Sequence, residues 1–482
     1  MPDLRPVVHI LGLLLIALGL TMLVPAAIDL AMGGGGWRVF VMSAFVSALS
    51  GVGFALATAN ARVPSLSLRQ SFLLTTLTWI ILPAYGAIPI YVGEGDLGLT
   101  NALFESMSGM TTTGTTVMVG LDDLGPGILL WRSILQWLGG LGIVIVALIF
   151  LPVMKVGGMQ YFRAEGFDTM GKIMPRVTDI ALMLVQVYLG LTIIAALAYV
   201  LVGLGAFDAV NHALTTIATG GYSTRDTSFA EFSPSAQYVS TALMWLSGLP
   251  FIRYVQLVNG SAMPLMQDVQ VRAYLRWTLY AIGAIVAYRL AQSDVGFEQT
   301  LRESAFNTVS LWSGTGYGTA SVTDWGDFPL LVVMVGGFIG ACTASTGCSI
   351  KVFRFIVLFE AIKSQLRQLV HPNRVSLVHI GGRRVEDEVI SSVIVMFTAF
   401  VLGFGVLVIL LSLSGLEMRT AITASWTAIC NIGPVFGHGV SGSGAVDGFP
   451  DSAKWLMIAG MLLGRLEMVA VLVLFLPRFW RT

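Results

Sequence analysis

The chain has 482 residues, of which 55% are hydrophobic and 11% are charged, and its formal net charge is zero. Since an ordinary soluble domain is roughly a quarter charged, this composition excludes a soluble globular protein and indicates a chain that lies mostly in a membrane. The balanced charge gives no support for nucleic-acid binding. The three cysteines, Cys342, Cys348 and Cys430, show neither a disulfide framework nor the spacing of metal ligands.

Long apolar segments follow one another along the whole chain. A helix that crosses a bilayer needs about 20 mainly apolar residues. Ten segments meet this requirement: 7–32, 37–60, 71–93, 126–156, 177–204, 234–262, 273–293, 328–362, 389–414 and 453–477. The first is too long for the apolar region of a signal peptide, so we expect it to be retained as a helix. The sequence predicts an all-α polytopic membrane protein with about ten transmembrane helices.

Short amphipathic stretches separate the two members of each of the last four pairs of spans. They cover residues 99–110, 207–217, 300–312 and 418–430, and they are too short to cross a membrane. Each ends at a segment centred on glycine, and these segments recur about every hundred residues: Thr112-Thr113-Gly114, Ala218-Thr219-Gly220, Gly314-Thr315-Gly316 and Asn431-Ile432-Gly433. The first pair of spans encloses only a run of four glycines.

This pattern predicts four repeats of helix, pore helix, filter and helix around one central pore. The predicted divisions of the chain are an N-terminal two-helix segment, 1–65, and four pore repeats, 66–170, 171–268, 269–380 and 381–482.

The glycine-centred segments are expected to face one shared polar space. Non-helical backbone at membrane depth is tolerated only where it is buried in protein or lines water. Glycine permits backbone conformations that a Cβ forbids, so carbonyl oxygens can turn inward. The pore helices also point their negative C-terminal ends at this space, which favours a cation. The third segment continues as Thr315-Gly316-Tyr317-Gly318, close to the loop whose carbonyls replace the hydration shell of K⁺ in potassium channels.

The positive charges predict an orientation. If the N-terminus is inside and the spans alternate, sixteen Lys and Arg residues fall in inner segments and seven in outer ones, in agreement with the positive-inside rule. Both termini are then cytoplasmic, and the four glycine-centred segments lie toward the outside. The outer loops are rich in Asp and Glu, so an acidic vestibule that concentrates cations is expected.

Polar residues interrupt two of the later spans. Residues 340–349 are small or hydroxylated, and at this depth such residues line water or form a helix-packing patch. Arg465 in the last span is expected to face the interior, because an arginine in contact with hydrocarbon is costly. A structural pair with Glu467 remains open, although the i,i+2 spacing places the two on different faces. Lys351 faces the pore or extends to the inner surface.

These residues carry a resemblance to a known family. The four glycine-centred segments are followed by matching stretches in the expected order: Gln136-Trp137-Leu138-Gly139-Gly140, Ser247-Gly248-Leu249-Pro250, Gly340-Ala341-Cys342 and Gly464-Arg465-Leu466-Glu467. The chain resembles the TrkH-type membrane subunits of the Trk/Ktr/HKT superfamily of K⁺ transporters over nearly its whole length. The extra N-terminal helix pair favours this type over KtrB, which resembles the four-repeat core alone.

The resemblance implies potassium uptake across the bacterial inner membrane. It implies a homodimer in the lipid bilayer that binds a cytosolic TrkA-like regulatory ring. The nucleotide site belongs to that ring, so no cofactor is expected in this chain, and K⁺ is the transported ion. The implied K⁺-binding filter, the only metal site expected, consists of Thr112, Thr113, Gly114, Ala218, Thr219, Gly220, Gly314, Thr315, Gly316, Asn431, Ile432 and Gly433.

The resemblance also implies a gate below the filter. Its residues are Gly340, Thr343, Ser345, Thr346 and Gly347 in an intramembrane loop, together with Lys351 and with Arg465 as an electrostatic barrier. The sequence departs from the family where Ala344, Cys348 and Ser349 replace the usual glycines. It also departs where Val435 follows Pro434.

Two alternatives come from other classes of protein. A secondary cation carrier, coupled to Na⁺ or H⁺, also uses a discontinuous-helix site at the midplane. Carriers usually show two inverted repeats, whereas four copies run in one direction here. A membrane enzyme would need a catalytic motif, and the sequence contains no His-Glu-x-x-His, nucleophile elbow or paired intramembrane carboxylates. We therefore expect a transport protein and not an enzyme.

Overall fold

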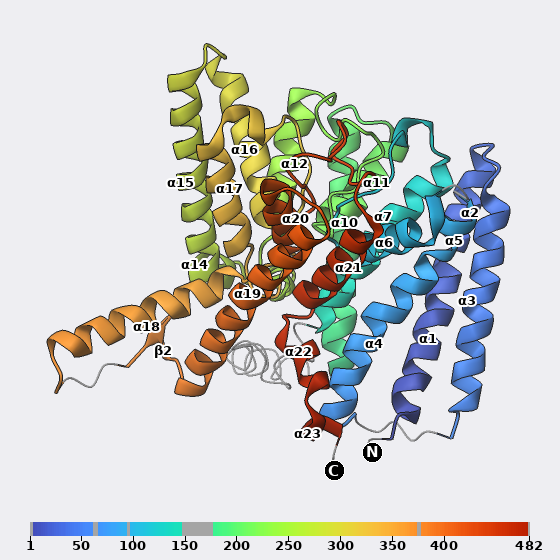
Figure 1. Cartoon of the computed structure of the whole chain (residues 1–482), viewed down its shortest axis with the longest axis horizontal. Coiled ribbons are helices and arrows are strands. Elements are labelled where there is room, and N and C mark those ends of the chain that lie inside the picture. Colours follow the sequence, from blue (N-terminus) through green and yellow to red (C-terminus); the bar gives the residue numbers. More distant parts are fainter. Residues whose placement is uncertain (1–2, 61–65, 94–96, 147–176, 374–376, 481–482) are drawn as a thin grey trace.

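The computed structural model describes residues 3–60, 66–93, 97–146, 177–373 and 377–480. The chain forms a helical bundle in which the N- and C-terminal ends lie at the same end of the molecule (Figure 1). A short antiparallel hairpin, β1 (His379–Ile380) with β2 (Arg383–Arg384), lies between the third and fourth repeats in the sequence.

The N-terminal helices pack against each other through glycines. They are α1 (Arg5–Thr21), α2 (Leu23–Ala31) and α3 (Trp37–Ala57), at one flank of the bundle (Figure 1). A Cβ at Gly12 would lie 2.7 Å from the carbonyl oxygen of Gly51, and one at Gly19 would lie 2.8 Å from that of Ala44. Small residues of this kind let membrane helices approach closely.

Four units with the same order of elements follow. The first contains α4 (Leu68–Gly86), α5 (Ile88–Gly93), the pore helix α6 (Gly98–Met110) and α7 (Pro126–Ile145). The second contains α10 (Val177–Leu201), the pore helix α11 (Ala206–Ile217), α12 (Pro234–Ser247), α13 (Phe251–Val258) and α14 (Met263–Gln267). The third contains α15 (Val269–Gln292), the pore helix α16 (Phe297–Ser313), α17 (Asp327–Ile339) and α18 (Val352–Val370).

The fourth unit contains α19 (Asp387–Leu413), the pore helix α20 (Met418–Cys430), α21 (Asp451–Arg465), α22 (Val469–Leu472) and α23 (Pro477–Trp480). The predicted all-α membrane architecture is therefore confirmed. The four pore helices begin and end within three residues of the predicted bounds.

Four of the ten predicted spans are not single apolar helices: 234–262, 273–293, 328–362 and 453–477. In the described part of the chain, six helices are long and apolar enough to cross a membrane, or seven if the bent α21–α22 pair is one span. Segment 234–262 is broken between α12 and α13, and segment 328–362 is broken between α17 and α18. Helix α15 is unbroken, but it carries Arg272, Arg276 and Arg289.

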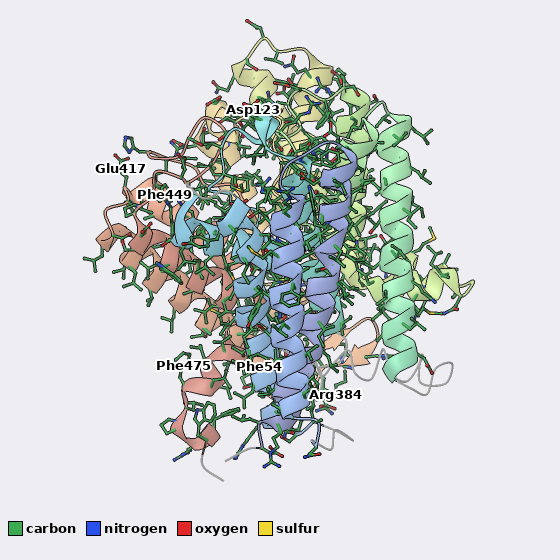
Figure 2. The ribbon with its side chains drawn as sticks, turned by 90° about the vertical axis from the view of Figure 1, so that its right-hand side faces the viewer. Phe54, Asp123, Arg384, Glu417, Phe449 and Phe475 are labelled. Carbon is green, nitrogen blue, oxygen red and sulfur yellow. The ribbon has the colours of Figure 1, made fainter. Side chains whose placement is uncertain are left out.

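Labelled acidic and basic side chains lie toward opposite ends of the bundle. Figure 2 shows Asp123 and Glu417 toward one end and Arg384 toward the other, and the termini in Figure 1 lie at the end of Arg384. Several of the predicted inner cations fall outside the described residues: Arg62, Lys155, Arg163, Lys172, Arg176, Arg374 and Arg481. The orientation in the membrane stays a prediction.

Glycines bring two outer helices onto the ends of pore helices. A Cβ at Gly139 of α7 would overlap the carbonyl group of Met110, with its carbon at 2.8 Å. A Cβ at Gly464 of α21 would overlap the carbonyl group of Ile429, with its carbon at 2.7 Å. In the first and fourth repeats, therefore, the helix after the glycine-centred segment packs directly on the C-terminal end of the pore helix.

Gly139→Ala is expected to destabilise the protein by about 1–3 kcal/mol, because a clash with backbone is not relieved by side-chain rotation. Gly142→Ala on the same helix is the matched control, since the nearest atom to its Cβ would be Trp79 Cζ2 at 3.7 Å. Thermal unfolding of the purified variants measures the difference. Equal melting temperatures would contradict the close approach.

Candidate functional site

The four glycine-centred segments share one backbone turn. In each, an N–H group donates to the carbonyl oxygen five residues earlier in the pore helix. The distances are 2.9 Å from Thr113 to Ser108, 2.8 Å from Gly220 to Thr215, 2.9 Å from Thr315 to Ser310 and 3.2 Å from Ile432 to Thr427. The next residue is a glycine with positive φ: 85° at Gly114, 80° at Gly221, 87° at Gly316 and 113° at Gly433. A Cβ at these positions would be strained.

This shared turn shifts the second segment by one residue. The sequence pattern centres it on Gly220, but the glycine with positive φ is Gly221. The residues equivalent to those of the other segments are therefore Thr219, Gly220 and Gly221. Ala218 is instead the C-terminal cap of α11. Because Gly220 and Gly221 are adjacent, the sequence alone allows either to be the central glycine. The hydrogen bond from Gly220 N–H to Thr215 O makes Gly221 the central one.

The four segments form a closed ring. In each segment, a Cβ on the positive-φ glycine would meet a carbonyl oxygen of a neighbouring segment. The pairs of glycine and carbonyl are Gly114 with Gly220, Gly221 with Thr315, Gly316 with Ile432, and Gly433 with Thr113. Each repeat thus touches the next, and the fourth returns to the first. Two side-chain hydrogen bonds strengthen the last junction: Thr115 Oγ1 donates to Gly433 O at 2.7 Å, and Asn431 Nδ2 donates to Thr113 Oγ1 at 2.8 Å.

A cavity of about 600 Å³ adjoins this ring, and all four repeats line it. The four positive-φ glycines each contribute to its wall, as expected for one shared polar space. The charged residues of the described wall are Arg132, Arg225 and Asp226. The described wall of this cavity, with two arginines and one aspartate, is therefore not the acidic vestibule that the sequence predicted.

A buried ion pair supports the ring between the first and second repeats. Arg132 Nε donates to Glu105 Oε1 at 2.8 Å, and both side chains are buried. Glu105 also accepts from the N–H of Val117 at 2.9 Å, and Arg132 Nη1 donates to the carbonyl of Ser223 at 3.1 Å. The Arg132–Glu105 ion pair thus holds the backbone just after the first glycine-centred segment, at Val117, and just after the second, at Ser223. The sequence analysis missed it, although ionisable residues within membrane segments are a recognised signal.

The helix that follows the third segment is interrupted by a buried loop, residues 340–351. The loop is bonded to the break between α12 and α13, since Cys342 N–H donates to Gly248 O at 3.0 Å and Phe251 N–H donates to Ala344 O at 2.8 Å. A Cβ at Gly347 would lie 2.7 Å from the carbonyl oxygen of Ser313. The loop therefore lies directly against the end of the third pore helix.

The residues expected in a gate are gathered in this loop. Gly340 accepts from Trp312 Nε1 at 3.1 Å, and Thr343 N–H donates to Gln270 Oε1 at 2.9 Å. Ser345 Oγ bonds within the loop, and Thr346 Oγ1 donates toward α12.

Backbone strain occurs at two of the three positions where a glycine was expected, Ala344 and Ser349, and also at Lys351. Ala344, Ser349 and Lys351 have φ angles of 61°, 71° and 79°. Left-handed conformations of residues with a Cβ cost of the order of 1–3 kcal/mol each, and they persist where surrounding contacts hold them. Lys351 is 4% exposed, so its side chain stays inside the protein and does not extend to the inner surface.

Arg465 joins the loop to the first repeat. It is 2% exposed. Its Nη2 donates to Gly139 O at 3.0 Å, and its Nη1 donates to Thr346 O at 3.4 Å and contacts Cys348 Sγ. The guanidinium also lies 5.2 Å from the centre of the Trp79 ring. Arg465 therefore faces the interior, as the sequence predicts.

Glu467 pairs with a different arginine from the one the sequence suggests. Its Oε2 lies 2.5 Å from Nη2 of Arg354 on α18, and both side chains are buried. The open alternative of an Arg465–Glu467 pair is thus not the ion pair found here. The partner lies on another helix, so local spacing gave no signal for it.

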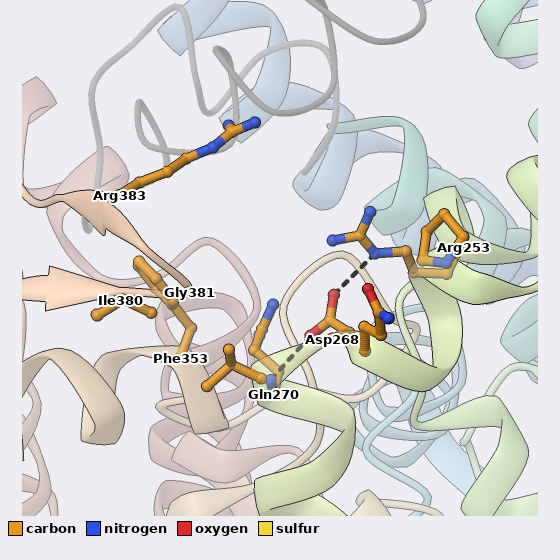
Figure 3. A pocket seen from close by; sticks show the side chains of 10 residues that line it. Arg253, Asp268, Gln270, Phe353, Ile380, Gly381 and Arg383 are labelled. Carbon is orange, nitrogen blue, oxygen red and sulfur yellow. Dashed lines mark hydrogen bonds and ion pairs between the residues drawn. The ribbon is translucent and has the colours of Figure 1, made fainter.

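A pocket of about 230 Å³ lies beside the loop, at the end that holds the β hairpin. Figure 3 shows Arg253 and Asp268 facing each other there, with Nε and Oδ2 at 2.8 Å. Asp268 Oδ1 accepts from Gln270 N–H at 2.8 Å and caps α15. Since Gln270 also bonds Thr343, the wall of the pocket is connected to the loop.

This architecture has close counterparts among known proteins. Residues 38–482 match the family model described as TrkH, a cation transport protein. The chain belongs to the TrkH family. The predicted resemblance is thus confirmed, and a member of this family is a transport protein and not an enzyme.

Individual relatives cover almost the whole chain. The Trk system potassium uptake protein TrkI of Halomonas elongata is 39% identical over 87% of this chain and 86% of that protein. The Trk system potassium uptake protein TrkH of Escherichia coli K12 is 36% identical over 99% of both. The crystal structure of the potassium transporter TrkH from Vibrio parahaemolyticus matches with a TM-score of 0.92, at 33% identity and 100% coverage of both chains.

A double-mutant cycle tests the pairing of Glu467. Glu467→Gln and Arg354→Met are each expected to lower stability by about 3–5 kcal/mol, because each breaks the buried ion pair. The double variant should lose much less than the sum of the two. Melting temperatures measure the coupling. The control cycle combines Glu467→Gln with Arg465→Met, and a stronger coupling there would contradict the observed pair.

Proposed function

We propose that this TrkH family protein takes up potassium across the bacterial inner membrane, through the ring of four backbone segments. The ring carries the proposal, because four equivalent turns meet around one cavity and leave backbone carbonyl groups to surround an ion. Rings of backbone carbonyls replace the hydration shell of K⁺ in channels. The printed names of the relatives, potassium uptake proteins, support K⁺ as the ion.

The proposed ion ligands are backbone carbonyls, with the second segment in its structural register. They belong to Thr112, Thr113, Gly114, Thr219, Gly220, Gly221, Gly314, Thr315, Gly316, Asn431, Ile432 and Gly433. The four pore helices add the negative ends of their dipoles, which attract a cation without a fixed carboxylate. A site made of dipoles suits a weakly hydrated monovalent ion.

The buried loop 340–351 is the proposed gate, with Arg465 as its electrostatic part. The loop lies against the end of the third pore helix, and Arg465 donates to its Thr346 carbonyl. A unit positive charge about 8 Å from a K⁺ ion, at an effective dielectric of 20, repels it by roughly 2 kcal/mol. Such a barrier slows permeation without blocking it.

The proposed quaternary assembly is the one that the resemblance to TrkH-type subunits implies. We propose a homodimer in the lipid bilayer, with both termini cytoplasmic and a TrkA-like regulatory ring on the cytosolic side. Strand β2 lies in the half of the molecule that holds the termini (Figure 1), and residues of the β hairpin, Ile380 and Arg383, line the Arg253–Asp268 pocket. This half is therefore the proposed docking side of the ring.

Replacement of Gly114, Gly221, Gly316 or Gly433 by serine is expected to lower the K⁺/Na⁺ flux ratio, because a Cβ strains a backbone of positive φ and disturbs its carbonyls. The control is Gly283→Ser on α15, where a Cβ would have nothing within 4 Å. Fluxes of K⁺, Rb⁺, Na⁺ and Li⁺ into liposomes give the ratios. Parental ratios in all four variants would reject the filter. Uptake that depends strictly on a Na⁺ or pH gradient would favour a coupled carrier.

Arg465→Ala is expected to increase K⁺ flux up to about 30-fold, the factor that corresponds to removal of a barrier of roughly 2 kcal/mol. Arg465→Lys keeps the charge and should stay close to the parent. Liposome flux measures both variants, and the melting temperature shows that each is folded. A folded Arg465→Ala variant that conducts no faster would exclude the barrier.

A further inference from the structure

Gln136 of α7 lies behind the second segment of the ring. Its Nε2 donates to the carbonyl oxygen of Gly220 at 2.7 Å, and its Oε1 accepts from the N–H of Tyr222 at 3.0 Å. The side chain is fully buried. These two bonds reach the peptide groups on either side of Gly221, the residue of positive φ. One amide therefore holds both groups that set the backbone conformation of Gly221.

The residue before the central glycine is different in this repeat alone. Thr113, Thr315 and Ile432 carry side chains at this position, and each has its own contacts. Thr113 Oγ1 bonds Thr111 Oγ1 at 2.7 Å, Thr315 Oγ1 bonds Ser313 Oγ at 2.8 Å, and Ile432 packs into the apolar core. Gly220 has no side chain with which to brace its peptide group.

The amide of Gln136 occupies the space that a side chain at residue 220 would need. A Cβ at Gly220 would overlap this amide, with Nε2 at 2.8 Å. The amide also lies near the junction with the first segment, since a Cβ at Gly114 would be 3.7 Å from the same nitrogen. Gln136 and Gly220 are thus complementary: the side chain missing from one repeat is replaced by one from the neighbouring repeat.

We propose that Gln136 is a positioning residue for ion selectivity, and that residue 220 is glycine in order to admit it. This inference rests on the proposed filter. A carbonyl oxygen has two lone pairs, so the Gly220 oxygen can accept from Gln136 and still face an ion. The amide then fixes the direction of this carbonyl, which side-chain packing fixes in the other three repeats.

The test measures K⁺/Na⁺ and K⁺/Rb⁺ flux ratios in liposomes with the full chain. Gln136→Met keeps the length of the side chain and removes both hydrogen bonds, whereas Gln136→Glu keeps the shape and removes the donor. Both variants are expected to lower the K⁺/Na⁺ ratio about tenfold, since one unsatisfied buried hydrogen bond is worth about one power of ten in an equilibrium. The melting temperature of each variant is recorded in parallel.

A rescue experiment separates positioning from general stability. Gly220→Thr alone is expected to lose selectivity, because its side chain overlaps the amide. The double variant Gly220→Thr with Gln136→Ala places a side chain at residue 220 and clears the space for it, so that packing holds this residue as it holds Ile432. It should recover selectivity above either single exchange, although Ala218 offers no hydroxyl like those of Thr111 and Ser313. A double variant no better than Gly220→Thr alone would overturn the complementarity. If Gln136→Met does not fold, the double variant, which fills the same space, decides the question.

The control Gly316→Ser distinguishes this inference from the proposed function. If Gly316→Ser loses selectivity while Gln136→Met and Gln136→Glu keep the parental ratios, the positioning role is wrong and the filter stands. If Gly316→Ser and the serine variants of Gly114, Gly221 and Gly433 all keep the parental ratio, the filter itself is wrong, and the inference is overturned with it.

Discussion

The hydrogen bond from each glycine-centred segment to the carbonyl five residues earlier is the constraint on which the ring of four segments depends. At membrane depth an unpaired N–H group costs several kcal/mol, so the chain can leave the pore helix only by a turn that pairs its own backbone. This bond makes that turn in all four repeats. The residue before the donor takes the left-handed conformation that such a bond requires: Thr112, Thr219, Gly314 and Asn431 all have positive φ. The residue after the donor also has positive φ, and it is a glycine in all four repeats. Pore helix, turn and glycine therefore form one unit.

One backbone arrangement is supported by different side chains in different repeats. Ser108 Oγ donates to the carbonyl of Thr115 at 2.6 Å, and Ser310 Oγ makes the equivalent bond to Tyr317 at 2.7 Å. In the fourth repeat Thr427 Oγ1 instead accepts from the N–H of Gly433 at 2.6 Å. In every repeat the main chain must pair its own N–H and carbonyl groups at the turn. The surrounding side chains need only fill the space and pair the remaining polar groups, so they can differ from one repeat to the next. Equivalent substitutions in different repeats therefore need not have equal effects.

The sequence predicted the features that depend on local patterns. The spans and pore helices follow from apolar length and amphipathic stretches, and the four-repeat order follows from the spacing of the glycines. The features it missed depend on contacts between distant segments. Nothing local distinguishes Gly220 from Gly221 as the central glycine, and the partner of Glu467, Arg354, lies on another helix. The breaks at 248–250 and 340–351 become intelligible only together, because their backbone groups bond one another.

The buried loop combines strain with anchors from several directions. Its residues with positive φ and a Cβ favour another conformation by about 1–3 kcal/mol each, and the loop is held against this strain by bonds to separate elements. Arg465 ties it to Gly139 of the first repeat, and Gln270 ties it to the capped end of α15 beside the Arg253–Asp268 pair. A segment held in this way responds to the loss of a single anchor more readily than one whose conformation is intrinsically favoured. One of these anchors is a charged residue inside the bundle, and the other borders the pocket that the β hairpin helps to line.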